Sequence, residues 1–420
     1  MRVLNLSGNS WKEIRHKRVI TFIPKWQNCS MNRYYTMNRI LLLCVGLWPY
    51  QKSSSKYIII PFMTIMLTSG VIAQLMTFVT TEYSTDILLH ILTYTIPWLG
   101  YTLKYNALCL NMKQMRDLME RVCCDWNELN NIQEIEIIKE YSAFGRFITL
   151  VLTLFMYTCI SCFILVQFLS NILIDIMSSK NESHLRQFPI LIECFIDQQK
   201  YFFPILLQLC VVVICGLTTV LAAETINMLY TQHVCGLFEI ASYRIEQALH
   251  PDIIQSIAPT KRNSMIYQEI INGFNMYRRA TEFMDLLKIN IKRTYSLLLP
   301  LGVLSLSINL YRFSRLIDSK DYYEMIVSFI FIIGHFGYML FGNYLGQKII
   351  DHSSDIFYKT YNVQWYTAPL RAQKLLLLVM QRGMRHCTIV IGGLFIPSFE
   401  GFATLTSMSI SYFAMILSLF

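Results

Sequence analysis

The last fifty residues hold the polar groups whose spacing is most informative. Between Arg371 and Phe420 a basic amphipathic segment leads into an apolar stretch. Within that stretch five polar residues recur at steps of three or four: Glu400, Thr404, Ser407, Ser411 and Ser418. Such steps place side chains on one side of an α-helix. Serine and threonine in membrane helices also bond to their own backbone or pack against neighbouring helices, so the stripe alone leaves that alternative open.

Glu400 favours one interpretation of this stripe. A carboxylate inside an apolar segment usually faces a bundle interior or a water-filled path, which indicates a pore-lining helix. Because only about twenty residues follow it, Glu400 also fits a helix end that is solvated at the inner membrane surface. Both positions remain possible from the sequence.

Motifs for enzymatic chemistry are absent from the sequence. There is no glycine-rich phosphate loop ending in Lys-Ser or Lys-Thr, no histidine pair at metal-ligand spacing and no Gly-x-Ser-x-Gly. Cys123-Cys124 and Cys159-x-x-Cys162 have no partner ligands nearby in the sequence. We therefore expect no enzyme activity, no cofactor and no metal.

The composition is that of a polytopic membrane protein surrounded by membrane lipid. Of 420 residues, 54% are hydrophobic and only 15% are charged, and the mean hydropathy is positive. The net charge of +9 is concentrated in particular loops, so it reports membrane topology and does not indicate a nucleic-acid partner. Only Cys194 of the 12 cysteines falls in a predicted outer loop, which leaves no extracellular disulfide within the chain.

Seven apolar runs are long enough to cross about 30 Å of hydrocarbon. They are Tyr57–Thr81, Ile87–Leu103, Phe147–Ile174, Tyr201–Ala223, Thr294–Tyr311, Met325–Gln347 and Thr388–Phe420. The first six hold almost no ionisable groups apart from His90 and His335, which argues against ion-coupled transport. We predict an all-α bundle of seven transmembrane helices, preceded by a segment at 1–56 without a cleavable signal peptide.

Lysine and arginine are distributed unevenly between the loops. Segments on the side of the N-terminus carry 30 of the 36, and segments on the other side carry 6. By the positive-inside rule, the N-terminus is cytoplasmic and the C-terminus extracellular. The glycosylation sequon at Asn181 then lies outside the cell, whereas those at Asn5 and Asn28 lie inside.

The cytoplasmic segments keep helical periodicity. Apolar positions recur at helical steps over 226–249 and, beyond a break at 251–259, over 266–287. We expect helical extensions at 224–293 that bury these faces against each other or against neighbouring subunits; helices lying on the inner leaflet are the alternative. The chain then divides into a cytoplasmic N-terminal segment, 1–56, the first six spans with these extensions, 57–347, and an anchor helix with the seventh span, 348–420.

The C-terminal third carries a recognisable order of motifs. These are Tyr361-x-x-x-Trp365-Tyr366, Leu375 to Met380 with Gln381-Arg382, Ile391-Gly392-Gly393, Pro397, Phe402 and Ser411-Tyr412-Phe413. Near the start, Asn38-Arg39-Ile40 leads to Gly46-Leu47-Trp48-Pro49. The chain from about Met37 onward resembles the insect odorant receptors. Related gustatory receptors typically end in Gln-Phe where this chain has Ser418-Leu419, which favours an odorant-tuned member.

The resemblance implies a ligand-gated cation channel in which four subunits surround a central pore, with cytoplasmic helices as the anchor. It implies an odorant-binding tuning subunit, assembled with the family's co-receptor in the plasma membrane of olfactory sensory neuron dendrites. The long intracellular insertion of the co-receptor itself is missing. Matching the tail places Met415, Ser418 and Leu419 at the outer pore constriction. The expected pore-lining residues are therefore Glu400, Thr404, Ser407, Ser411, Met415, Ser418 and Leu419.

The ligand implied by this resemblance is a small, volatile and mostly apolar molecule. It needs an apolar, aromatic cavity between spans. The resemblance implies a position in the outer halves of the second, third, fourth and sixth spans. Candidate ligand-binding residues there are Tyr94, Tyr157, Ser161, Phe202, Leu206 and Phe329. Ordinary helix packing is the alternative for each of them.

Three other functions compete with this one. A metabotropic receptor coupled to a G protein has its N-terminus outside, usually a disulfide between outer loops, and a cytoplasmic tail; the sequence predicts none of these. A gustatory-type channel subunit fits the same topology but not the last residues. A membrane scaffold without a signalling role would not explain Glu400 and the polar stripe.

Overall fold

The computed structural model describes residues 32–80, 84–177, 188, 190–193, 195–256, 259–319 and 322–419. Nearly all of them are helical. The elements are α2 (Asn32–Cys44), α3 (Ser53–Thr80), α4 (Thr85–Leu110), α5 (Met112–Glu128), α6 (Ile132–Met177), α7 (Phe202–Ala248), α8 (Pro251–Ser256), α9 (Pro259–Ser319), α10 (Tyr322–Asn362), η2 (Trp365–Thr367), α11 (Leu370–Gly383) and α12 (Phe399–Leu419). Asn5, Asn28, Asn181 and Cys194 lie outside the described residues.

The predicted all-α fold is confirmed within the described residues. Six helices, α3, α6, α7, α9, α10 and α12, are long and apolar enough to cross a membrane. α4 contains the predicted second span and packs against α3, α7 and α9, so it is the seventh long helix of the bundle. The first six predicted spans each coincide with part of a helix, and several of these helices extend well beyond the apolar run.

The seventh helix is shorter than the predicted span, Thr388–Phe420. Residues 384–398 are not helical, and α12 begins at Phe399. Gly392 and Gly393 have φ of 59° and 80°, a left-handed conformation that favours glycine, and they form a turn closed by a bridge between Ile391 and Phe395. The 21 residues of α12 still span about 31 Å at 1.5 Å per residue, which is enough to cross the hydrocarbon.

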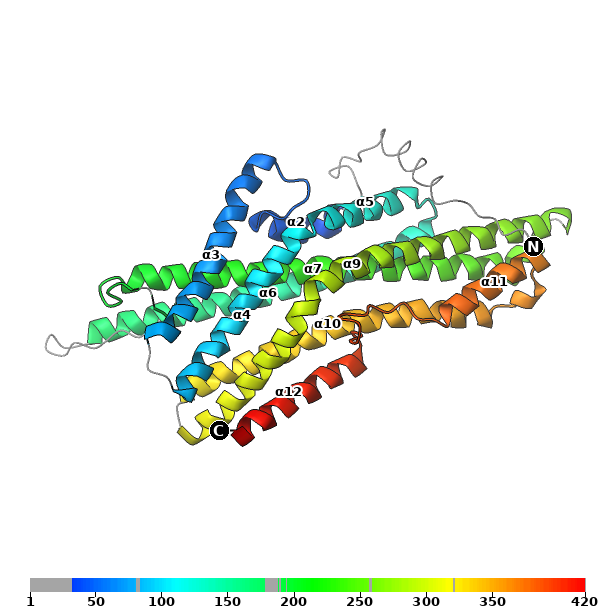
Figure 1. Cartoon of the computed structure of the whole chain (residues 1–420). Coiled ribbons are helices and arrows are strands. Elements are labelled where there is room, and N and C mark those ends of the chain that lie inside the picture. The colour runs from blue at the N-terminus through cyan, green and yellow to red at the C-terminus, as the bar shows by residue number, and fades with distance from the viewer. Residues whose placement is uncertain are drawn as a thin grey trace.

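The long helices run side by side along the molecule, as Figure 1 shows for α6, α7, α9 and α10. α7 is the central one, because α4, α6, α9 and α10 all pack against it. Every side chain from Leu221 to Phe238 is buried, as expected for a helix that is enclosed on all sides. α12 lies at one side of the bundle, against α9 and α10.

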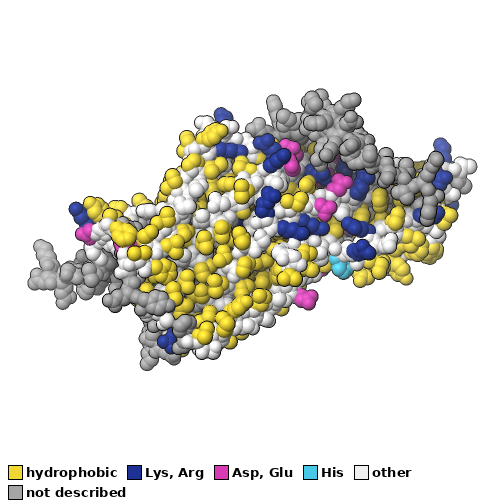
Figure 2. All heavy atoms as spheres, viewed as in Figure 1, with side chains coloured by type: hydrophobic (Ala, Val, Ile, Leu, Met, Phe, Trp, Pro, Cys, Tyr) yellow, Lys and Arg dark blue, Asp and Glu magenta, His cyan; other side chains and the backbone are white. Residues whose placement is uncertain are grey.

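The bundle has two halves of different character. We call the "membrane half" the part built from α3, α4, α12 and residues 147–169, 202–223, 294–317 and 322–343. We call the "charged half" the part built from α5, α11 and residues 132–146, 224–248, 259–293 and 348–362. Exposed apolar side chains such as Phe155, Leu207 and Ile330 belong to the membrane half. Figure 2 shows hydrophobic side chains spread over one part of the surface and Lys and Arg gathered over another.

Residues 224–248 and 259–293, for which helical extensions were expected, lie in α7 and α9 and bury apolar side chains. In α7, the positions Ile226, Tyr230, Leu237 and Ile245 are at most 1% exposed. Ion pairs join neighbouring helices there: Arg244 binds Glu134 of α6 through two bonds of 2.7 Å. Charged side chains therefore join neighbouring helices in the charged half.

Candidate functional site

α12 has one face packed on its own chain and one face left open. Gly401, Leu405 and Ser409 are buried against α9 and α10. On the other side, the predicted stripe of Glu400, Thr404, Ser407, Ser411 and Ser418 is exposed, and its first part lines a shallow open groove. Met415 and Leu419 are also exposed, at 50% and 66%. No helix of the described chain covers this face.

The hydroxyls of the stripe bond to their own helix. Thr404 donates to the carbonyl of Glu400 at 2.9 Å, Ser411 to that of Ser407 at 2.9 Å, and Ser418 to that of Met415 at 2.8 Å. This is the backbone bonding that competes with a functional interpretation. Each hydroxyl only donates in these bonds, so the lone pairs of its oxygen can still accept hydrogen bonds. Glu400 lies in the first turn of α12, where the helix dipole stabilises a carboxylate.

Side chains of α10 hold the beginning of α12. The Asn343 Oδ1 accepts the backbone N–H of Ser398 at 3.0 Å, and the Gln347 Oε1 accepts that of Phe399 at 3.2 Å. The Ser398 hydroxyl oxygen accepts the N–H of Gly401 at 2.9 Å. These N–H groups are among those that a helix start leaves without intrahelical partners, so α10 directly positions the open-faced helix.

The connector that precedes α12, residues 384–398, is anchored at two further points. The N–H of Cys387 donates to the hydroxyl of Ser353 in α10 at 3.0 Å. Burial raises the pKa of the Cys387 thiol, so this buried group stays neutral at physiological pH. Gly346 of α10 contacts the backbone of Pro397 so closely that a Cβ there would overlap it. The path from α11 to α12 is therefore fixed along α10.

The predicted ligand-binding residues fall in several places. Phe202 and Leu206 lie one turn apart in α7 and are buried together with Cys210, and the ring of Phe202 stacks on Phe188 at 4.5 Å between centroids. Tyr94 of α4 is 4% exposed and meets Phe331 of α10 edge to face at 5.4 Å. These two groups belong to separate core clusters.

The other three candidates are more peripheral. Tyr157 of α6 forms a hydrogen bond of 2.9 Å with the hydroxyl of Thr218 in α7. Ser161 is exposed, and Phe329 is 50% exposed beside Phe313. The structure thus brings Phe202 and Leu206 together and leaves the remaining four at distinct positions of the membrane half.

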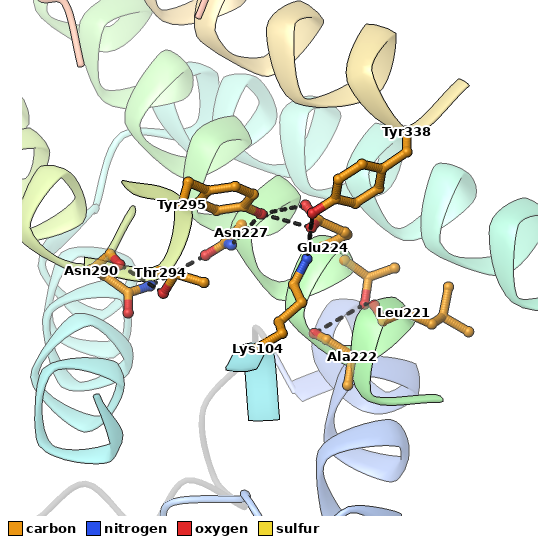
Figure 3. Close-up of polar contacts among 10 residues, drawn as sticks. Lys104, Leu221, Ala222, Glu224, Asn227, Asn290, Thr294, Tyr295 and Tyr338 are labelled. Carbon is orange, nitrogen blue, oxygen red and sulfur yellow. Dashed lines mark hydrogen bonds and ion pairs between the residues drawn. The ribbon is translucent and has the colours of Figure 1, made fainter. Parts of the chain in front are cut away.

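A buried polar cluster was missed by sequence reasoning. Lys104 of α4 forms an ion pair with Glu224 of α7, and their residues are only 1% and 6% exposed. Tyr295 of α9 donates to both carboxylate oxygens at 2.7 Å, and Tyr338 of α10 donates to Oε1 at 3.0 Å. Figure 3 shows all four side chains converging from four helices. Both charged residues lie one position beyond a predicted span, so the expectation of few ionisable groups within the six spans did not include them.

The sequence contained a signal for this pair. Lys104 follows directly on the second apolar run, and Glu224 follows directly on the fourth. Both runs were predicted to end on the same side of the membrane, so opposite charges one residue beyond each were candidates for pairing. A second pair, Arg312 with Glu324, lies where α9 and α10 meet at the far end of the membrane half. Arg312 is 7% exposed and lies 5.7 Å from the ring centre of Tyr94.

The architecture defines a multi-pass, all-helical membrane protein whose last helix presents a polar face. The chain matches the family described as 7tm Odorant receptor over residues 84–410, which is most of its length. The chain therefore belongs to the odorant receptor family, as its motifs predicted. Proteins of this family are odorant receptors, not enzymes. A search of curated proteins found no match.

Two solved structures are similar over nearly the whole chain. One is the insect olfactory receptor OR5 from Machilis hrabei in complex with eugenol, with 14% identity, a TM-score of 0.69, and coverage of 93% of this chain and 98% of that one. The other is the same receptor described without a ligand, with 13% identity, a TM-score of 0.66, and coverage of 93% and 99%. At such identities the likeness establishes the fold alone.

Proposed function

We propose that this chain is the odorant-binding tuning subunit of a heteromeric, ligand-gated, non-selective cation channel. In this proposal four subunits, including copies of a co-receptor, surround a pore lined by α12. The complex resides in the plasma membrane of olfactory sensory neuron dendrites. The single observation that carries the proposal is the open polar face of α12, because no helix of the described chain covers it. Water in a pore is a suitable neighbour for such a face.

The charge and size of the exposed residues suit a cation path. Glu400, exposed at the start of α12, gives a negative potential that attracts cations. Near the other end, Met415 presents an apolar side chain on the side of the polar stripe, and Leu419, which the resemblance places at the constriction, lies one turn beyond it. Apolar side chains that converge at a narrow point exclude water and stop ions, and spreading them apart admits both.

Ligand binding is proposed to act through a population shift. A volatile, mostly apolar odorant binds in the membrane half, with Tyr94, Phe202 and Leu206 as the buried candidates among the residues predicted. The OR5 receptor, which shares the fold, has been solved with eugenol. A ligand opens the channel only if it binds the open arrangement more tightly than the closed one. Asn343 and Gln347 provide a direct contact from α10 to the start of α12.

Alanine substitutions at two equally exposed apolar positions of α12 test the pore assignment. Met415 is 50% exposed on the side of the polar stripe, and Leu417 is 51% exposed but lies off that side. With a co-receptor present, Met415→Ala is expected to change resting leak or ion selectivity, because it widens the constriction. Leu417→Ala is expected to behave like the wild type. Unaltered currents in Met415→Ala, or equal changes in both variants, would contradict the pore assignment.

A further inference from the structure

A cavity separate from the predicted odorant site lies behind α12. It has about 830 Å³ of empty space, including its open mouth, and is narrow for its extent. α7, α9, α10, the connector and α12 all contribute to its walls. None of the six residues predicted to bind odorant lines it. It therefore requires an explanation of its own.

The walls of this cavity are apolar except at one end. Leu298, Gly302 and Met339 are among the apolar lining residues, and Leu405 of α12 closes one side. At the polar end lie Glu224, Tyr295 and Tyr338, the cluster seen in Figure 3. The Lys104 ammonium neutralises the carboxylate, so this end offers hydrogen bonds without a net charge.

Hydrogen bonding at the polar end favours one kind of partner. Among the described residues, the Glu224 Oε1 accepts from Lys104, Tyr295 and Tyr338, whereas Oε2 accepts only from Tyr295. A carboxylate oxygen can accept at least two hydrogen bonds, so Oε2 retains acceptor capacity. Both tyrosine hydroxyls already donate their proton to Glu224. The carboxylate therefore has a free acceptor, and neither tyrosine hydroxyl has a free donor.

Of the remaining polar groups around the cavity, His335 and Asn343 are committed, whereas the buried hydroxyl of Thr231 forms no hydrogen bond with the described residues. The two ring nitrogens of His335 bond to the carbonyl of Phe331 at 2.7 Å and to the hydroxyl of Ser305 at 2.8 Å. The Asn343 amide donates to the carbonyl of Met339 at 2.8 Å while its oxygen holds the start of α12. A ligand that both donates and accepts can bond to the Glu224 Oε2 and to the Thr231 hydroxyl, whereas a ligand that only accepts leaves the Oε2 unfilled.

We propose that this cavity is a binding site for a small lipophilic alcohol of slim shape. The hydroxyl donates to the Glu224 Oε2, and the hydrocarbon chain lies along the apolar walls between α9, α10 and α12. A ketone, aldehyde or ester of the same length lacks the donor and binds more weakly. Because Leu405 and the connector form part of the wall, the bound molecule contacts the start of α12.

Purified receptor in lipid nanodiscs and a photoreactive octanol test the site without any channel recording. Labelled positions are mapped by mass spectrometry, and unlabelled octanol and octanone compete with the probe. A hydrogen bond to a charged group contributes about 1.5–3 kcal/mol, so octanone is expected to compete about tenfold or more weakly than octanol. Labelling is expected on the α9 and α10 residues that line the cavity. Equal competition, or no labelling of those residues, would overturn the proposal.

Two glycines of α10 provide a matched pair of variants. A Cβ at Gly342, which lines the cavity, meets no atom within 4 Å, and neither does one at Gly337, which does not line it. Gly342→Leu is expected to fill the cavity and remove labelling, whereas Gly337→Leu retains it. Labelling of Gly342→Leu at the wild-type level would also overturn the proposal. If this variant does not fold, the competition on wild-type protein still decides, and neither result depends on whether the chain forms a channel.

Discussion

At the scale of single residues, the ion pair of Lys104 and Glu224 is the most consequential contact in the bundle. It joins α4 to α7, and Tyr295 and Tyr338 extend it to α9 and α10. Removing two charges from water costs several kcal/mol, which the pair and its hydroxyl partners offset only together. The ion pair therefore acts mainly by fixing the relative positions of α4, α7, α9 and α10.

Lys104→Met is expected to lower the free energy of unfolding by about 3–5 kcal/mol, because it leaves a buried carboxylate without its cation. The double variant with Glu224→Gln removes the second charge and is expected to recover part of this loss. Thermal unfolding of the purified variants measures both effects. A single variant as stable as the wild type, or a double variant that recovers nothing, would contradict the role given to the pair.

The sequence predicts the polar stripe of α12 but not the pairing of Lys104 with Glu224. The helical steps of Glu400, Thr404, Ser407 and Ser411 are a local property, so their common exposed face could be predicted. The pairing of Lys104 with Glu224 depends on how α4 and α7 pack, which periodicity does not encode. A charge next to an apolar run fits a solvated membrane surface equally well, so burial could not be read from either residue alone.

At the scale of elements, the position at which α12 begins depends on the contacts between α10 and the connector. The hydropathy pattern predicts that the seventh span begins at Thr388, because residues 389–391 and 394–396 are apolar. The left-handed Gly392 and Gly393 interrupt the helix there. An apolar run therefore predicted membrane burial but not the point where the helix begins. Gly342 and Gly346 of α10 also differ in their surroundings: a Cβ at Gly342 would meet no atom within 4 Å, whereas a Cβ at Gly346 would overlap Pro397.

Gly346→Ala is expected to displace the connector, because its Cβ would overlap the backbone of Pro397. Such overpacking costs about 1–3 kcal/mol. Gly342→Ala, one turn earlier in α10, is the control, since its Cβ meets nothing within 4 Å. Thermal stability of the two purified variants gives the comparison. If both variants were equally stable, the connector would not be held in the way described.

At the scale of the whole molecule, the helices gather their charged ends in one half. Segments that the positive-inside rule assigns to the cytoplasm, among them α5 and α11, lie together in the charged half. Ion pairs such as Arg244 with Glu134 and Lys359 with Glu239 join them. The seven long helices and the extensions of α7 and α9 could be predicted from periodicity and length. The position of a ligand site could not, because it depends on residues from several helices.

The orientation predicted for this arrangement is tested by glycosylation. Asn181→Gln is expected to abolish the mobility shift that a glycosidase produces, because this sequon is predicted to lie outside the cell. Asn5→Gln and Asn28→Gln are expected to leave the shift unchanged. A shift that depends on Asn5 or Asn28 would place the N-terminus outside and favour a metabotropic receptor.

The open face of α12 is the centre of the proposed function, and cysteine accessibility tests it most directly. Ser411 is exposed on the polar side, whereas Ser409, two residues away, is fully buried against α9. With a co-receptor present, a charged methanethiosulfonate reagent is expected to block the odorant-evoked current of Ser411→Cys. The currents of Ser409→Cys and of the wild type are expected to stay unchanged. A Ser411→Cys current that the reagent leaves unchanged, or equal block of Ser409→Cys, would contradict a pore lined by α12.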